Sequence, residues 1–85
     1  MSVYSIYVAA PQDAVRGAAK RIAERRGIVL DVEAAPEYDG YEAAVDLYNH
    51  DESVVRSVAS DLRIELPGVT VDTEFEVEAK LSATS

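Results

Sequence analysis

Alternation of apolar and polar side chains predicts four β-strands along the chain. The last strand alternates most regularly, with apolar side chains or Thr at odd positions and Asp, Glu or Thr at even positions. A period of two is typical of a strand that has one buried and one solvent-facing side. The predicted strands cover residues 3–9, 28–35, 41–48 and 69–79.

Two segments between these strands have apolar residues at helical spacing. The first helix is predicted to end at Gly27, which can adopt the left-handed conformation that follows many helices. The second follows the third strand, where Asn49 and Glu52 have the spacing of a capping box and Asp51 is the alternative N-cap. Residues 80–85 are expected to form a flexible C-terminal tail.

The order βαββαβ predicts an α+β, ferredoxin-like sandwich. Right-handed crossovers give a four-stranded antiparallel sheet of order 4-1-3-2 with both helices on one face. Residues 1–79 are expected to form one domain, with an Asp-Gly hairpin turn at Asp39 and Gly40. Because this architecture hosts many unrelated functions, the fold alone predicts none of them.

The acidic composition narrows the classes of partner. The chain has 16 Asp and Glu against 8 Lys and Arg, with a formal net charge of −8. Such a balance disfavours direct binding to nucleic acid and to anionic membranes, which both attract basic proteins. The sequence contains no Cys, no basic start of a secretory signal and no apolar run of membrane-spanning length. We therefore expect a cytoplasmic protein that does not interact with a membrane.

The acidic residues concentrate on the side of the predicted sheet that faces away from the helices. The first helix carries more Arg and Lys than Asp and Glu, so we expect a basic helix opposite an acidic sheet. Two tyrosines, on the first and third strands, are expected to be neighbours on this face, whereas Tyr38 and Tyr41 flank the hairpin turn. The predicted partner-binding residues are Tyr7, Asp31, Glu33, Glu42, Asp46, Tyr48, Asp72, Glu74, Glu76 and Glu78.

No constellation of residues in the sequence predicts catalysis. His50 is the only histidine and lies at a loop-to-helix junction, where an exposed or capping role is usual. The chain has neither a Walker A loop nor a G-x-G-x-x-G turn. A flat row of carboxylates also lacks the converging loop of a selective Ca²⁺ or Mg²⁺ site. We therefore expect no enzyme activity, no cofactor and no bound metal.

The acidic sheet is interpreted as a binding surface for a basic protein. Like charges that face one another across strands destabilise a sheet, and a binding function gives a reason to retain them. Such a surface could also act as an anionic inhibitor that occupies a nucleic-acid groove of its partner. A homodimer formed by antiparallel pairing along the edge of the fourth strand is a further expectation.

Two alternatives stay open. In one, the acidity is only an adaptation to a salty cytoplasm, which the low Lys content fits. In the other, the chain senses a small ligand. The stretch from Ala10 to Val32, a loop and a helix that ends Glu-Arg-Arg-Gly before a strand, is similar in outline to ACT regulatory domains. That resemblance implies amino-acid binding at a dimer interface, although ACT domains usually carry a glycine where this chain has Pro11, Gln12 and Asp13.

Overall fold

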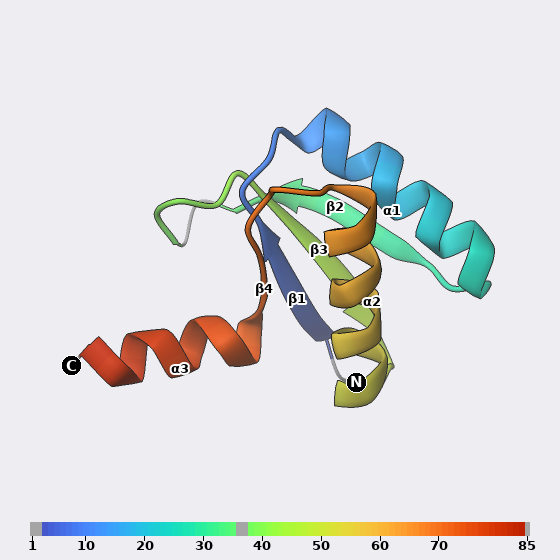
Figure 1. The fold of residues 1–85 in the computed structure, drawn as a ribbon. Helices are drawn as coiled ribbons and strands as arrows, with labels where there is room; N and C mark the ends of the chain where they lie inside the picture. Colours follow the sequence, from blue (N-terminus) through green and yellow to red (C-terminus); the bar gives the residue numbers. More distant parts are fainter. Residues whose placement is uncertain (1–2, 36–37, 85) are drawn as a thin grey trace.

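The computed structural model describes residues 3–35 and 38–84 as a four-stranded antiparallel sheet with helices against it. The sheet order β2-β3-β1-β4 is the predicted order 4-1-3-2 read from the other edge. Helices α1 and α2 cover one face of the sheet (Figure 1). The elements are β1 (Val3–Val8), α1 (Gln12–Arg26), β2 (Leu30–Ala34), β3 (Ala43–Tyr48), α2 (Glu52–Glu65), β4 (Val71–Thr73) and α3 (Glu74–Thr84). The predicted ferredoxin-like layout is consistent with this arrangement.

The main core lies between the sheet and the two covering helices. The central strands contribute Ile6 and Leu47, and the helices contribute Ile22 and Leu62, all fully buried. These positions follow the period of two in the strands and the helical spacing in α1 and α2, as the sequence predicts. This core is almost entirely aliphatic, with two aromatic rings at its margin.

The helix ends confirm one prediction and correct another. Gly27 adopts the left-handed conformation (φ 67°) after α1, as predicted. At α2 the N-cap is Asp51, whose carboxylate accepts a hydrogen bond of 3.1 Å from the Val54 N–H. The capping box expected from Asn49 is wrong, because Asn49 itself has a left-handed backbone (φ 62°). An N-cap residue needs an extended backbone, which Asp51 has.

The fourth strand is much shorter than predicted. Only Val71–Thr73 pairs with β1, and the chain then turns directly into α3. The cause is a capping box formed by Thr73 and Glu76. The Thr73 hydroxyl accepts from the Glu76 N–H (3.3 Å), while the Glu76 carboxylate accepts from the Thr73 N–H (3.1 Å). Residues 80–84 continue α3 instead of forming the expected flexible tail, and residue 85 lies outside the described residues.

Helix α3 packs against the face of the sheet that α1 and α2 leave uncovered. Its Val77 is buried with Tyr7 and Ala44 of the sheet in a second, smaller apolar cluster. The helix covers one end of this face and then extends away from the sheet (Figure 1). The face that the sequence predicts as fully open is therefore open only in part.

Candidate protein-binding surface

The uncovered part of the sheet carries a row of carboxylates that crosses three strands. Asp31 of β2 lies directly opposite Asp46 of β3, and Asp46 lies opposite Ser5 of β1. The Ser5 hydroxyl donates to the Asp46 carboxylate (2.7 Å), while the Ser5 N–H donates to Glu74 Oε1 (2.6 Å). We call Asp31, Asp46 and Glu74, with Glu33 two residues along β2 from Asp31, the acidic row.

Burial differs along the acidic row. Asp46 is 5% exposed, whereas Asp31 and Glu33 on the edge strand are exposed. Tyr48 lies at the end of β3 and hydrogen-bonds to Asp31, which raises the pKa of the phenol. The negative charges of Asp31 and Asp46 act in the same direction. A partner approaching this face therefore meets carboxylates at the edge first.

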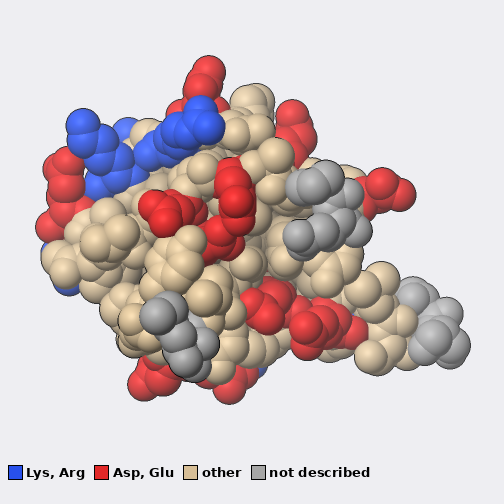
Figure 2. All heavy atoms as spheres, turned by 180° about the vertical axis from the view of Figure 1, so that it is seen from behind, with Lys and Arg blue, Asp and Glu red and all other residues tan. Residues whose placement is uncertain are grey.

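Carboxylates gather on this side of the molecule, as Figure 2 shows from behind the view of Figure 1. Most of the Lys and Arg atoms in that view lie at the upper left, where α1 runs. Glu42 precedes β3 and is exposed near the opposite end of that strand from Tyr48. Glu78 is exposed on α3.

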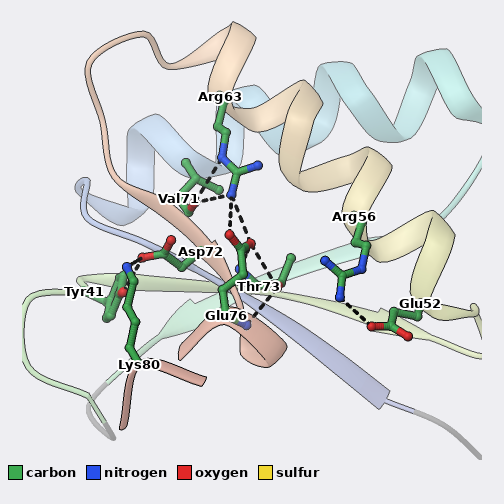
Figure 3. Close-up of polar contacts among 9 residues, drawn as sticks. All are labelled: Tyr41, Glu52, Arg56, Arg63, Val71, Asp72, Thr73, Glu76 and Lys80. Carbon is green, nitrogen blue, oxygen red and sulfur yellow. Dashed lines mark hydrogen bonds and ion pairs between the residues drawn. The ribbon is translucent and has the colours of Figure 1, made fainter. Parts of the chain in front are cut away.

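Asp72 lies on the predicted side of the sheet, but α3 covers it. Tyr41 donates to its carboxylate (2.5 Å), as does Lys80 Nζ of α3 (2.8 Å), and the residue is 7% exposed (Figure 3). Burial alone would raise the pKa of Asp72, but the hydrogen bonds from Lys80 and Tyr41 outweigh it and lower the pKa. Asp72 therefore fastens α3 to the sheet and is not available to a partner.

Glu76 lies at the outer edge of β4 and not on the open face. Its carboxylate binds the Thr73 cap and Arg63 of α2, with 3.1 Å between Oε1 and the Arg63 Nη2 (Figure 3). Burial opposes ionisation, but the hydrogen bonds from Thr73 and Arg63 are stronger and lower the pKa of Glu76. The prediction that Asp72, Glu74, Glu76 and Glu78 share one strand face is therefore wrong, because all but Asp72 belong to a helix.

The tyrosines also differ from the prediction. Tyr48 pairs with Val3, at the other end of β1 from Tyr7, so the two rings are not neighbours. Tyr7 is instead 7% exposed, with ring centroids 4.9 Å from Tyr38 and 5.8 Å from Tyr41. The expected pairing fails because antiparallel register, which the sequence does not specify here, decides which residues lie opposite. Tyr7 belongs to the cluster under α3 and not to an exposed binding surface.

The positive charge expected on α1 is largely paired with α2. Arg21 and Arg26 make ion pairs of 2.5 Å with Glu65 and 2.6 Å with Asp61. The hydrogen bond from Arg21 lowers the pKa of Glu65. Within residues 3–35 and 38–84, by contrast, no Lys or Arg forms an ion pair with Asp31 or Asp46. Ion pairs with α2 therefore offset part of the positive charge of α1, whereas the carboxylates of Asp31 and Asp46 have no such offset among the described residues.

The described part of the chain contains no cluster of metal ligands. No group of three His, Asp or Glu side chains there is placed to hold a metal ion. No described helix is long and apolar enough to cross a membrane.

Comparison with known protein families, curated proteins and solved structures finds no match for the chain.

Proposed function

We propose that this chain is a non-enzymatic interaction module that binds a basic protein surface through the acidic row. The observation that carries the proposal is the direct opposition of Asp31 and Asp46 on paired strands, where no Lys or Arg of the described residues forms an ion pair with either one. Like charges in this arrangement destabilise a sheet. A Lys or Arg side chain of a partner, placed between the two carboxylates, would remove that repulsion.

The charge distribution supports the same partner chemistry. Elsewhere in the molecule the carboxylates of α2 and Asp72 have Arg or Lys partners, which reduces their attraction for an outside cation. The carboxylates on the sheet give that side a negative potential, which speeds encounter with a basic surface. A protein that uses a basic groove to bind nucleic acid belongs to this class of partner, and the chain would then act as an anionic inhibitor. The lack of Cys is in keeping with a place in the cytoplasm.

The test compares two variants of equal net charge with a purified linker histone as the basic probe. The first removes exposed charge on the sheet side through Asp31→Asn, Glu33→Gln and Glu42→Gln. We expect its dissociation constant for the histone to rise about tenfold, because three contacts at roughly 0.5 kcal/mol each correspond to that factor.

The control variant carries Asp13→Asn, Asp39→Asn and Glu52→Gln, which remove three exposed charges elsewhere. Both variants change the net charge of −8 by the same amount. The control is expected to bind the histone nearly as tightly as the unchanged chain. Equal weakening of both variants would mean that total charge, and not the acidic row, attracts basic proteins, and would refute the proposal.

A further inference from the structure

The two edges of the sheet differ in whether another strand can pair with them. At β4, Ala9 N–H donates to the carbonyl of Thr70, so the backbone groups of Val71 and Thr73 point away from β1. Arg63 donates to the Val71 carbonyl from Nε (3.1 Å) and Nη2 (2.7 Å), and Glu76 accepts from the Thr73 N–H (Figure 3). Side chains therefore occupy the outer edge of β4, the edge on which the homodimer expectation rests.

The β2 edge of the sheet differs from the β4 edge. In the described residues β2 pairs only with β3 and is the last strand on its side of the sheet. An uncovered edge strand presents backbone N–H and C=O groups that can pair with an added strand. Val29, immediately before the strand, is 70% exposed.

A groove with a mainly apolar lining runs between this edge and α1, and Arg16, Lys20 and Glu24 of the helix also line it. It has a volume of about 420 Å³, and its apolar lining comes from the small residues Ala19 and Ala23 of α1 with Ile28, Leu30 and Val32 beside them. Leu30 and Val32 are only half-buried, because α1 does not cover the outer side of β2. On the other side of the same strand, Asp31 and Glu33 point to the open face.

We propose that the β2 edge accepts an extended segment of the basic partner as a fifth strand, with basic and apolar side chains in alternation. This inference rests on the proposed function and specifies how the partner binds. Side chains of an added strand alternate between the two faces of the sheet. Those on the helix side would fill the groove, and those on the open side would lie opposite Asp31 and Glu33, about 5 Å away between Cβ atoms. Lys or Arg at these positions complements the charge.

The same charges argue against a second copy of the chain as the occupant. Antiparallel pairing of two β2 strands about a twofold axis at Val32 places Asp31 of each chain opposite Glu33 of the other. The interface would then contain two pairs of opposed carboxylates, and the repulsion within each pair destabilises the dimer. A basic strand meets the same two carboxylates with opposite charge.

The test uses synthetic peptides of about nine residues, enough for one strand. One alternates Val and Lys, a second contains the same residues in two blocks, and a third alternates Val and Glu. We expect the alternating Val-Lys peptide to bind about tenfold more tightly than the block peptide, because only alternation serves both faces of the sheet. It should also slow amide hydrogen exchange in residues 30–34.

Charge reversal gives the matched comparison. The double change Asp31→Lys with Glu33→Lys should lose the Val-Lys peptide and gain the Val-Glu peptide. The control Asp13→Lys with Glu78→Lys makes the same change of net charge at exposed positions outside β2. The control should still bind the Val-Lys peptide more tightly than the Val-Glu peptide, as the unchanged chain does. Circular dichroism checks that both variants fold.

The outcomes separate this inference from the proposed function. Histone binding that depends on the sheet-side charges, without protection of residues 30–34 by the Val-Lys peptide, would overturn strand addition and leave the proposed function intact. Protection by the peptide, with histone binding indifferent to those charges, would refute the proposed function alone. Protection of residues 30–34 that rises with protein concentration in the absence of peptide would show that a second copy occupies the edge, and would overturn the inference.

Discussion

Replacing Thr73 by Val tests whether the chain turns into a helix at residue 74. Val has nearly the volume of Thr, so no cavity forms, but it lacks the hydroxyl that accepts from the Glu76 N–H and donates to Glu76 Oε1 (3.1 Å). If residues 69–79 formed one long strand, the change would be neutral or stabilising, because Val is at least as favourable as Thr in a strand. The helical structure predicts instead that Thr73→Val destabilises the chain.

The expected loss follows from two contributions. Removal of an N-cap hydroxyl typically costs about 1 kcal/mol. The Thr73 side chain is fully buried, so the Glu76 N–H that loses its acceptor gains little from water, and this can bring the total to roughly 2 kcal/mol. We therefore expect Thr73→Val to lower the free energy of unfolding by about 1–2 kcal/mol.

The assay is urea unfolding followed by circular dichroism, with Thr70→Val as the matched control. Thr70 is exposed and lies three residues earlier in the same segment, so its replacement should change stability by no more than about 0.5 kcal/mol. Amide exchange should show faster opening of α3 in Thr73→Val, with little change in α1. A Thr73→Val variant as stable as the Thr70→Val control would refute the capping box and the helix that it begins.

Three further predictions concern the β4 edge, the pH dependence of stability and the effect of salt on the melting temperature. Arg63→Met should expose the β4 edge and cause concentration-dependent self-association in analytical ultracentrifugation, whereas Arg56→Met should sediment like the unchanged chain. The pKa values of Asp72 and Glu76 are lowered by folding, so their contribution to stability is complete above about pH 5 and declines as pH falls further. The melting temperature should stop rising by about 1 M KCl, where the Debye length is ~3 Å.

Each of these predictions has a result that contradicts it. If Arg63→Met sediments like Arg56→Met at every concentration, the Arg63 side chain does not protect the β4 edge. In urea unfolding from pH 7 to pH 3, the Asp72→Asn variant should lose less stability than the unchanged chain, and an identical decline would show that Asp72 does not supply the pH dependence. A melting temperature that keeps climbing toward 3 M KCl, or a chain unfolded at low salt, would favour adaptation to a salty cytoplasm.

The sequence predicts the fold well where hydrophobic periodicity and sheet pairing agree. The apolar stripes of α1 and α2, the left-handed Gly27 and the strand order all follow from patterns with a single physical reading. Residues 69–79 are different, because alternation of Val and Glu fits a strand while Thr73 and Glu76 fit a capping box. The spacing of three residues from Thr73 to Glu76 is the signal that could have identified α3 in advance.

The candidate surface is predicted less completely, because it depends on register and on α3. Asp31, Glu33 and Asp46 lie on the expected face, since alternation in β2 and β3 is enough to place them. Ser5, which joins Asp46 to Glu74, carries no signal in the sequence. The sequence gives no signal for the role of Lys80 either. Its contact with Asp72 requires a helix, which the interpretation of residues 69–79 as a strand excludes.

Zero-length carbodiimide cross-linking to the linker histone tests the central claim most directly, because it joins a carboxylate to a Lys only where the two are in contact. Mass spectrometry then identifies which carboxylates have reacted. The account predicts cross-links at Asp31 and Glu33 on the open face, with few at Asp13 and Glu52 on the helices, which are also exposed. Cross-links spread evenly over all exposed carboxylates, or concentrated on the helices, would contradict it.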